Sequence, residues 1–406
     1  MDLPMRILFV ALPSNIHTLR WINQITDLGW DIHLAPSIVD KLHPDLIGKV
    51  TFHDPSKRDI NTHDFSLREL AIGLLRRWPH PRGSGHAQRL IERLRPGASR
   101  QMLPGLAGII RRVRPDIIHS LIIPGAGYET LAACRLIGDD FPTWIVGNWG
   151  SDIHFYGQLA LHKERIKEVL AACDYLTCEC ARDIALAREF GFTGHALPVL
   201  SAAGGYDLER WQQFRQAGPT SSRRVILLKG YQHTVGRALV GLRAIELCAD
   251  VLQGYRVFIQ LASPDVKVAA EVLANRIGIP IDTVPLTPHA DYEEVIRRYG
   301  RARIHIGLSV SDGISQSLLE AMMMGAFPIQ SCTACADEWI EDGESGFIVP
   351  PEDPHIIAEA IRRAITDDAL VDRAAQINAK TVQKRLAYAD IKEKVVDMYK
   401  SVYAAL

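Results

Sequence analysis

The chain has 406 residues, enough for two or three domains, and its 47% hydrophobic and 23% charged residues are typical of a globular protein and exclude a disordered one. Its 46 basic and 47 acidic residues give a formal net charge of −1, so overall charge offers no reason to expect nucleic acid binding. The seven cysteines, an odd number in a long chain, exclude a disulfide framework and fit a reducing cytosol.

No segment approaches the roughly 18 apolar residues that a membrane-spanning helix requires. The apolar run at residues 7–12 is short for the hydrophobic region of a signal peptide and lacks a small-residue cleavage site, so we interpret it as a buried first strand. We expect a cytoplasmic protein that can lie peripherally at the inner face of the membrane. Cys332 and Cys335 are spaced like zinc ligands, but no second Cys or His pair accompanies them, so we expect buried small residues and no metal.

Short apolar runs alternate with amphipathic stretches of helical length, which is typical of parallel α/β sheets covered by helices on both faces. A first helix should begin at Asn15, a good N-cap residue, and end at Gly29. The sequence predicts the strands of the first half at residues 6–11, 31–35, 116–121, 143–146, 175–178 and 195–199.

Between residues 202 and 222 the periodicity lapses into glycine, proline and serine, which indicates an interdomain connection. A second series of strands is then predicted at residues 224–228, 255–261, 281–284, 303–307, 326–330 and 347–349. Helices at 353–366, 369–381 and 389–403 should end the chain. Two similar α/β halves follow from this pattern.

One basic segment interrupts the first half, with a single acid, Glu92, among its arginines. Its arginines are Arg76, Arg77, Arg82, Arg89, Arg93, Arg95, Arg100, Arg111, Arg112 and Arg114. Such a run can be a solvated face, or it can bind anionic lipid headgroups. We favour the membrane surface, because almost no acid compensates the charge. No helix-turn-helix, zinc-finger or RNA-binding signature accompanies the segment, so we expect no nucleic acid partner.

The most informative stretch is 307–322, where a strand passes through a polar loop into a helix. Unpaired backbone N–H groups and the helix dipole make such a helix start a natural seat for a phosphate. Asp312 in the loop and Glu320 inside the helix can flank a ligand whose diphosphate lies on the amides between them, and carboxylates accept hydrogen bonds from sugar hydroxyls. Capping of the turn at Ser315 is the plain structural alternative for Asp312.

This stretch resembles the C-terminal domain of retaining glycosyltransferases of the GT-B fold, and it is most similar to family 4. The matching residues are Ser309, Asp312, 318–322, Gly325, 328–329, Glu338, Gly343, 346–349 and Asp353. Asp312 and Glu320 occupy the positions of the family's pair of glutamates, although Asp312 is one methylene shorter. Residues 114–119 and 150–152 resemble the N-terminal domain of the same family.

The resemblance implies an α/β, GT-B protein with two Rossmann-like domains that face each other across a cleft. The expected parts are an N-terminal acceptor-binding domain at 1–202, a linker at 203–222, a nucleotide-sugar-binding domain at 223–385, and a C-terminal helix at 386–406 that packs back on the first domain.

The resemblance also assigns roles to residues of the second domain. Residues 226–230 look like the family's phosphate-binding strand, so Lys229 and Arg237 would stabilise the departing phosphate, while Tyr231 stands where an Arg is usual. Asp312 would contact the transferred hexose. The expected catalytic residues are therefore Asp312, Arg237 and Lys229. The expected donor-binding residues are Gly230, Gly313, Ile314, Ser315, Gln316, Ser317 and Glu320.

On the acceptor side we expect Asn15, His17, Trp149 and Asp152. Trp149 stands where the family often has a His, so the task of that His is missing or has moved. The first loop also lacks the double glycine of many relatives, and this makes it stiffer.

The implied function is retaining, metal-independent transfer of a hexose from a nucleotide sugar to a hydroxyl of a lipid-linked, polysaccharide or glycoconjugate acceptor. UDP is favoured by family frequency, no cofactor is expected beyond the sugar donor, and no Asp-x-Asp metal motif occurs in the chain. Two alternatives are a nucleotide-sugar epimerase of the same fold and a non-catalytic member that binds nucleotide sugars. An NAD dehydrogenase is disfavoured because no Gly-x-Gly-x-x-Gly follows the first strand.

Overall fold

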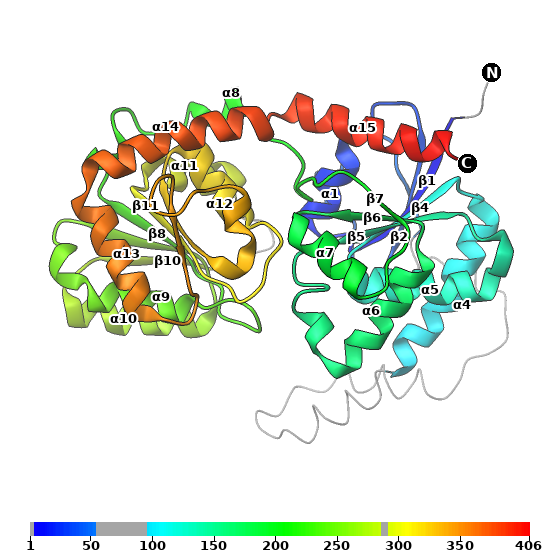
Figure 1. Cartoon of the computed structure of the whole chain (residues 1–406), viewed down its shortest axis with the longest axis horizontal. Coiled ribbons are helices and arrows are strands. Elements are labelled where there is room, and N and C mark those ends of the chain that lie inside the picture. The colour runs from blue at the N-terminus through cyan, green and yellow to red at the C-terminus, as the bar shows by residue number, and fades with distance from the viewer. Residues whose placement is uncertain (1–3, 54–95, 286–290) are drawn as a thin grey trace.

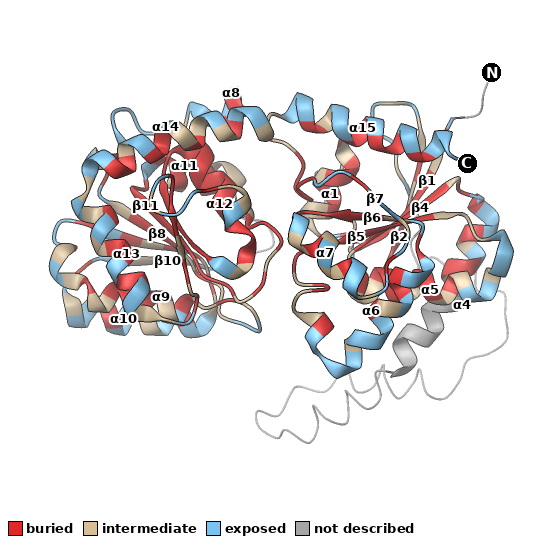
Figure 2. Ribbon diagram, viewed as in Figure 1, coloured by how far each residue is buried: buried red, intermediate tan, exposed pale blue. Residues whose placement is uncertain are grey.

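The computed structural model describes residues 4–53, 96–285 and 291–406, and these form two α/β lobes side by side (Figure 1). Each lobe is built on a sheet of parallel strands, and the strands are buried or half-buried along most of their length except the short edge strands at 51–52 and 195–196 (Figure 2). The expected α/β class with two parallel sheets is confirmed.

The sheet of the N-terminal lobe has strand order β3-β2-β1-β4-β5-β6-β7. Its strands are β1 Arg6–Ala11, β2 Asp31–Pro36, β3 Thr51–Phe52, β4 Ile117–Leu121, β5 Thr143–Asn148, β6 Tyr175–Cys178 and β7 His195–Ala196. The two-residue β3 was not anticipated, and β7 is shorter than predicted. The order reverses between β1 and β4, which places a crevice at their carboxyl ends.

The helices of this lobe are α1 Ile16–Asn23, α4 Pro96–Val113, α5 Tyr128–Ile137, α6 Ala160–Ala172 and α7 Ala181–Glu189. As predicted, Asn15 caps α1, because its side chain accepts a hydrogen bond from the His17 backbone N–H at 2.7 Å. The helix ends earlier than Gly29, since the amides of Gln24 and Ile25 bond to carbonyls three residues back and tighten the chain into turns.

The C-terminal lobe has strand order β10-β9-β8-β11-β12-β13. Its strands are β8 Val225–Lys229, β9 Arg256–Ala262, β10 Ile281–Pro285, β11 Ile304–Gly307, β12 Phe327–Ser331 and β13 Phe347–Val349. Its order reverses between β8 and β11. Both lobes therefore present the crevice that doubly wound sheets use for ligands.

The helices around this second sheet include one inside the expected linker, because α8 packs against α12. They are α8 Leu208–Gln212, α9 Ala238–Leu247, α10 Pro264–Ile277, α11 Tyr292–Arg301, α12 Gln316–Met324, α13 Pro354–Thr366 and α14 Asp368–Arg385. Much of segment 203–222 is thus ordered surface of the second lobe.

The last helix, α15 Tyr388–Ala404, lies on the N-terminal lobe beyond α14 (Figure 1). Its apolar side chains share a core with β1, β4 and α1. At the centre of this core Trp21 Nε1 donates to the Tyr399 hydroxyl at 2.8 Å, and that hydroxyl lies 2.7 Å from His119 Nδ1. Burial lowers the pKa of His119 to about 3, so the ring is neutral and its Nδ1 accepts the Tyr399 proton.

We expect Tyr399→Phe to lower the free energy of unfolding of the N-terminal lobe by about 2 kcal/mol, because two buried polar groups lose their partner. Urea unfolding followed by tryptophan fluorescence measures the change. Tyr403→Phe is the control, since Tyr403 is an exposed tyrosine of the same helix. Equal unfolding midpoints for the two variants would contradict the role given to the Tyr399 hydroxyl.

Candidate active site

A cleft of about 1210 Å³ lies between the lobes, at the carboxyl ends of both sheets. The N-terminal lobe contributes residues from α1 and from the loops after β4, β5 and β6. The C-terminal lobe contributes the ends of β8 and β9, the loop after β11, and the first turns of α11 and α12. The cleft therefore joins the topological switch points of the two sheets.

At the switch point of the second sheet, the Lys229 ammonium faces the loop before α12. Its Nζ lies 3.3 Å from Ser315 Oγ and 3.8 Å from Asp312 Oδ2. The other carboxylate oxygen of Asp312 accepts from the Gly313 N–H at 3.0 Å, so this carboxylate partly caps its own loop. Lys229 and Asp312, which sequence reasoning selected separately, are brought together here.

The start of α12 lines the same part of the cleft through Ile314, Gln316 and Ser317. Within the described part of the chain, no acceptor lies in hydrogen-bonding geometry with the backbone N–H groups of Gln316 and Ser317. These two amides are thus available to an anion at the positive end of the helix. The Gln316 side chain is already occupied, since its Oε1 accepts from the Tyr206 hydroxyl at 3.0 Å and its Nε2 donates to Ser201 Oγ.

Two glycines expected to bind the donor are required for close packing. A Cβ at Gly230 would lie 2.7 Å from Ala262 Cα, and the Gly230 amide already donates to the Gln260 carbonyl at 2.7 Å. A Cβ at Gly313 would lie 2.9 Å from the Cα of Gly150 in the other lobe. Both positions require glycine because backbones approach each other there.

Glu320 lies one turn inside α12, is buried, and lines the cleft. Its Oε1 accepts from the Tyr292 hydroxyl at 2.7 Å. Burial raises the pKa of Glu320, and the nearby Arg20 guanidinium opposes that rise. Burial and the Arg20 guanidinium of the other lobe thus act on Glu320 in opposite directions, and burial is the larger effect.

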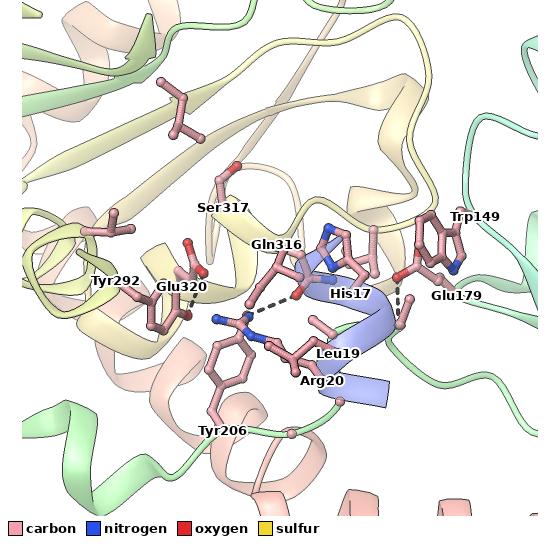
Figure 3. Close-up of a pocket in the computed structure, with 18 of the residues that line it drawn as sticks. His17, Leu19, Arg20, Trp149, Glu179, Tyr206, Tyr292, Gln316, Ser317 and Glu320 are labelled. Atoms are coloured by element: carbon pink, nitrogen blue, oxygen red, sulfur yellow. Dashed lines mark hydrogen bonds between the residues drawn. The ribbon is translucent and has the colours of Figure 1, made fainter. Parts of the chain in front are cut away.

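That cation, Arg20, was not anticipated from the sequence. It extends from α1 across the cleft, and its guanidinium carbon lies 4.3 Å from the ring centroid of Tyr292 and 5.9 Å from that of Tyr206 (Figure 3). Cation–π contact at such a sheltered position contributes about 1 kcal/mol or more. The group therefore connects α1 of one lobe to α11 and α12 of the other.

Arg237 does not line the cleft. Its guanidinium pairs with Glu352 at 3.0 Å and donates to the carbonyls of His233, Thr234 and Gly236, which are part of its own loop. The expectation that Arg237 faces the donor phosphate beside Lys229 is therefore not met by this geometry. Tyr231, in the position where an Arg is usual, does line the cleft, and Lys229 Nζ lies 5.0 Å from its ring centroid.

Of the four residues expected on the acceptor side, His17 and Trp149 line the cleft with their rings. Asn15 and Asp152 accept hydrogen bonds from nearby backbone amides. His17 packs edge-on against Trp149, with ring centroids 5.6 Å apart. Burial and the charges of Arg20 and Lys229 lower the pKa of His17 to about 4, so the imidazole is neutral at physiological pH. Asn15 is the cap of α1. The buried Asp152 carboxylate accepts from the Trp149 and Ile123 amides, although it also lines the cleft.

Glu179 is a further carboxyl group of the cleft that sequence reasoning missed (Figure 3). It follows β6, and its Oε1 accepts from the Ala202 N–H at 2.9 Å. Burial, and then the charge of Asp312 in the other lobe, raise the pKa of Glu179 to about 8. The signal that could have found it is its place at the carboxyl end of a predicted parallel strand.

The lobes touch beside this group. Arg182 of α7 donates to the carbonyls of Thr333 at 2.9 Å and Asp312 at 2.8 Å in the C-terminal lobe, and to the Gly150 carbonyl at 3.2 Å in its own lobe. Its Nε pairs with the fully buried Asp183 at 2.8 Å. One guanidinium thus neutralises a buried carboxylate and closes the cleft at its edge.

Comparison with known proteins agrees with this geometry. Residues 252–367 match the family model described as glycosyl transferases group 1, and residues 88–180 match the one described as glycosyl transferase 4-like. No curated protein matches the sequence.

Several solved structures share the fold over almost the whole chain. Sucrose-phosphate synthase from Thermosynechococcus elongatus superposes with a TM-score of 0.70 at 15% identity, covering 99% of this chain and 100% of that one. Anabaena HepE in complex with UDP-glucose gives a TM-score of 0.66 at 11% identity, covering 98% and 100%. A UDP-forming α,α-trehalose-phosphate synthase from Burkholderia xenovorans gives 0.66 at 13% identity, covering 98% and 99%. The two-lobed GT-B arrangement is confirmed.

We expect Arg182→Ala to open the cleft, because three carbonyl oxygens and the buried Asp183 lose the guanidinium that joins them. Small-angle X-ray scattering should show a larger radius of gyration than for the unaltered chain. Arg188→Ala is the matched control, since the Arg188 guanidinium contacts Phe192 within its own lobe. Identical scattering from both variants would show that Arg182 does not hold the lobes together.

Proposed function

We propose that this chain, which has the GT-B fold, is a glycosyltransferase and that it transfers a hexose from a nucleotide sugar, UDP-linked for preference, to an acceptor hydroxyl. We propose further that the transfer retains the anomeric configuration, needs no divalent metal ion, and uses a lipid-linked, polysaccharide or glycoconjugate acceptor.

The observation that carries the proposal is the convergence of the Lys229 ammonium, the Asp312 carboxylate and the open amides of α12 at one switch point. Breaking a sugar–phosphate bond develops negative charge on the departing diphosphate and positive charge at the anomeric carbon. Lys229 and the amides of Gln316 and Ser317 suit the first charge, and Asp312 suits the second. Glu320 lies deeper along α12, where it would hold the ribose hydroxyls.

Metal-independent transfer is proposed because these fixed groups already supply positive potential at the diphosphate position, and the sequence holds no Asp-x-Asp motif. UDP and a hexosyl group are proposed because HepE was solved with UDP-glucose and another similar structure is a UDP-forming trehalose-phosphate synthase. Retention of the anomeric configuration is proposed from the resemblance to family 4. In a front-face path the leaving phosphate takes the proton from the hydroxyl of the acceptor, so no nucleophile from the protein is required.

The acceptor proposal rests on the basic segment. Arg111, Arg112 and Arg114 are exposed around the end of α4. Arg76, Arg77, Arg82, Arg89, Arg93 and Arg95 lie outside the described residues, as does the side chain of Arg100. Among the described helices, none has the length and apolar character needed to cross a bilayer. We propose that the segment lies on anionic headgroups, which would bring a lipid-linked acceptor to the cleft.

Incubation with a panel of UDP-, GDP- and ADP-sugars, with and without a chelator, tests this proposal. We expect slow hydrolysis or transfer with a UDP-hexose, undiminished by the chelator. In a parallel measurement of UDP affinity, Lys229→Ala should weaken UDP binding about 10- to 100-fold, as expected for the loss of a charge-assisted hydrogen bond. Asp312→Ala should remove most turnover.

Lys267→Ala is the control for Lys229→Ala, because Lys267 is an exposed lysine of the same lobe. Interconversion of the sugar without transfer would identify an epimerase, and binding without reaction would identify a non-catalytic member. Unchanged UDP affinity in folded Lys229→Ala would remove the proposed diphosphate site.

We expect the chain to bind vesicles that contain anionic lipid, with an affinity that falls as salt rises, because each surface arginine contributes about 1 kcal/mol that salt screens. Arg76→Glu with Arg77→Glu should weaken sedimentation with these vesicles. Lys267→Glu with Arg373→Glu makes the same change of charge on exposed residues of the C-terminal lobe and should bind as the unaltered chain does. Binding that salt does not affect would count against a headgroup-binding segment.

A further inference from the structure

Two thiols and a carboxylate from different lobes meet at the contact that Arg182 closes. Cys180 Sγ, Cys335 Sγ and a carboxylate oxygen of Glu338 all lie within 4.8 Å of one another. Both cysteines are buried, and none of the three residues lines the cleft. The cluster is therefore separate from the proposed sugar site.

The backbone around Cys180, Cys335 and Glu338 sets where each of the three side chains lies. Cys180 precedes α7 as its N-cap residue, and the neighbouring Ala181 N–H donates to Glu338 Oε1 at 2.8 Å across the lobes. Cys335 has a left-handed backbone, with φ of 47°, between two short 3₁₀ turns. A non-glycine residue in that conformation is costly, and the thiol of Cys335 lies within 4.8 Å of the thiol of Cys180.

The spacing of the donor atoms suits a small tetrahedral cation. Zn–S bonds of about 2.3 Å and Zn–O bonds of about 2.0–2.2 Å place tetrahedral ligands roughly 3.5–3.8 Å apart. The three donors lie within 4.8 Å of one another, so they need to approach by at most about 1.3 Å to reach that separation. The zinc-like spacing in the sequence joined Cys335 to Cys332, but Cys332 is exposed and the partner of Cys335 comes from the other lobe.

The surrounding charges also suit a metal bound by thiolates. A divalent ion offsets most of the charge of two thiolates and one carboxylate and leaves a net charge of −1. The Arg182 guanidinium, which pairs with Asp183, also interacts with both cysteines. Cysteines bind a metal ion as thiolates, so an ion at this site displaces the thiol protons. Binding of a divalent ion therefore replaces two S–H protons, which are released to solvent.

We propose that Cys180, Cys335 and Glu338 bind one Zn²⁺ ion, with water as the fourth ligand, and that the ion fastens the two lobes together. The ion bonds to residues of both lobes, so opening the cleft requires at least one of these bonds to break. The site regulates access to the cleft and takes no part in the bond chemistry proposed above.

Titration of the reduced, metal-free full chain with Co²⁺ tests the proposal, because tetrahedral cobalt thiolates give characteristic visible and charge-transfer bands. We expect one equivalent of Co²⁺, displaced by Zn²⁺, in the unaltered chain and in Cys134→Ser, whose half-buried cysteine lies outside the cluster. Cys180→Ser and Cys335→Ser should each lose the charge-transfer band. Apparent affinity should rise with pH, since binding of the ion releases thiol protons.

Glu338→Gln keeps both thiols, so it tests the site even where a cysteine variant fails to fold. We expect it to retain the thiolate bands at a weaker affinity. Zn²⁺ should also reduce the radius of gyration of the unaltered chain and leave that of Cys335→Ser unchanged. The proposal is overturned by an absence of thiolate bands, by bands that persist in both cysteine variants, or by a metal-free chain lighter by two hydrogens, which would identify a disulfide.

Discussion

The approach of two glycine backbones, Gly150 in one lobe and Gly313 in the other, sets the geometry of the whole cleft. A Cβ added to Gly150 would collide with the Gly313 backbone nitrogen, so the lobes can meet here only without side chains. Because the backbones touch, the Arg182 guanidinium reaches carbonyls of both lobes. The same closure brings Arg20 onto the ring of Tyr292. Charged groups of one lobe then act on those of the other, so the lining of the closed cleft forms a single electrostatic unit.

This unit includes the carboxyl groups of Asp152, Glu179, Asp312 and Glu320, and closure places Asp312 of one lobe near Glu179 of the other. Burial raises the pKa of Glu179 to about 8, above its ordinary value, and the charge of Asp312 adds to the rise. The protonated form of Glu179 is therefore the form that the closed cleft favours. The stability that this proton gives the closed cleft is fully present below the ordinary pKa of a glutamate and is lost as pH rises through about 8. Glu320 differs, because Arg20 opposes the effect of burial.

Sequence patterns located the strands well and the contacts between lobes poorly. Alternating apolar runs placed both sheets, and helix chemistry placed Asn15 as a cap, because these signals are local. Arg237 was chosen by resemblance alone, and its pairing with Glu352 depends on a residue 115 positions away. Arg20 and the approach of Cys180 to Cys335 were missed for the same reason, since these contacts exist only where two lobes distant in sequence meet. Glu179, by contrast, had a local signal in its place directly after β6.

The two segments that cross between lobes also belong to the cleft. Residues 201–206 and 386–388 run alongside each other, with the Tyr206 amide donating to the Leu386 carbonyl at 2.7 Å and the Tyr388 amide donating to the Tyr206 carbonyl at 3.0 Å. A Cβ at Gly205 would lie 2.6 Å from Tyr388 Cα, so this pairing requires glycine. Tyr206 itself bonds to Gln316 at the start of α12. Tyr206 therefore links the two crossing segments to the helix end that would hold the diphosphate, because the same residue contacts both.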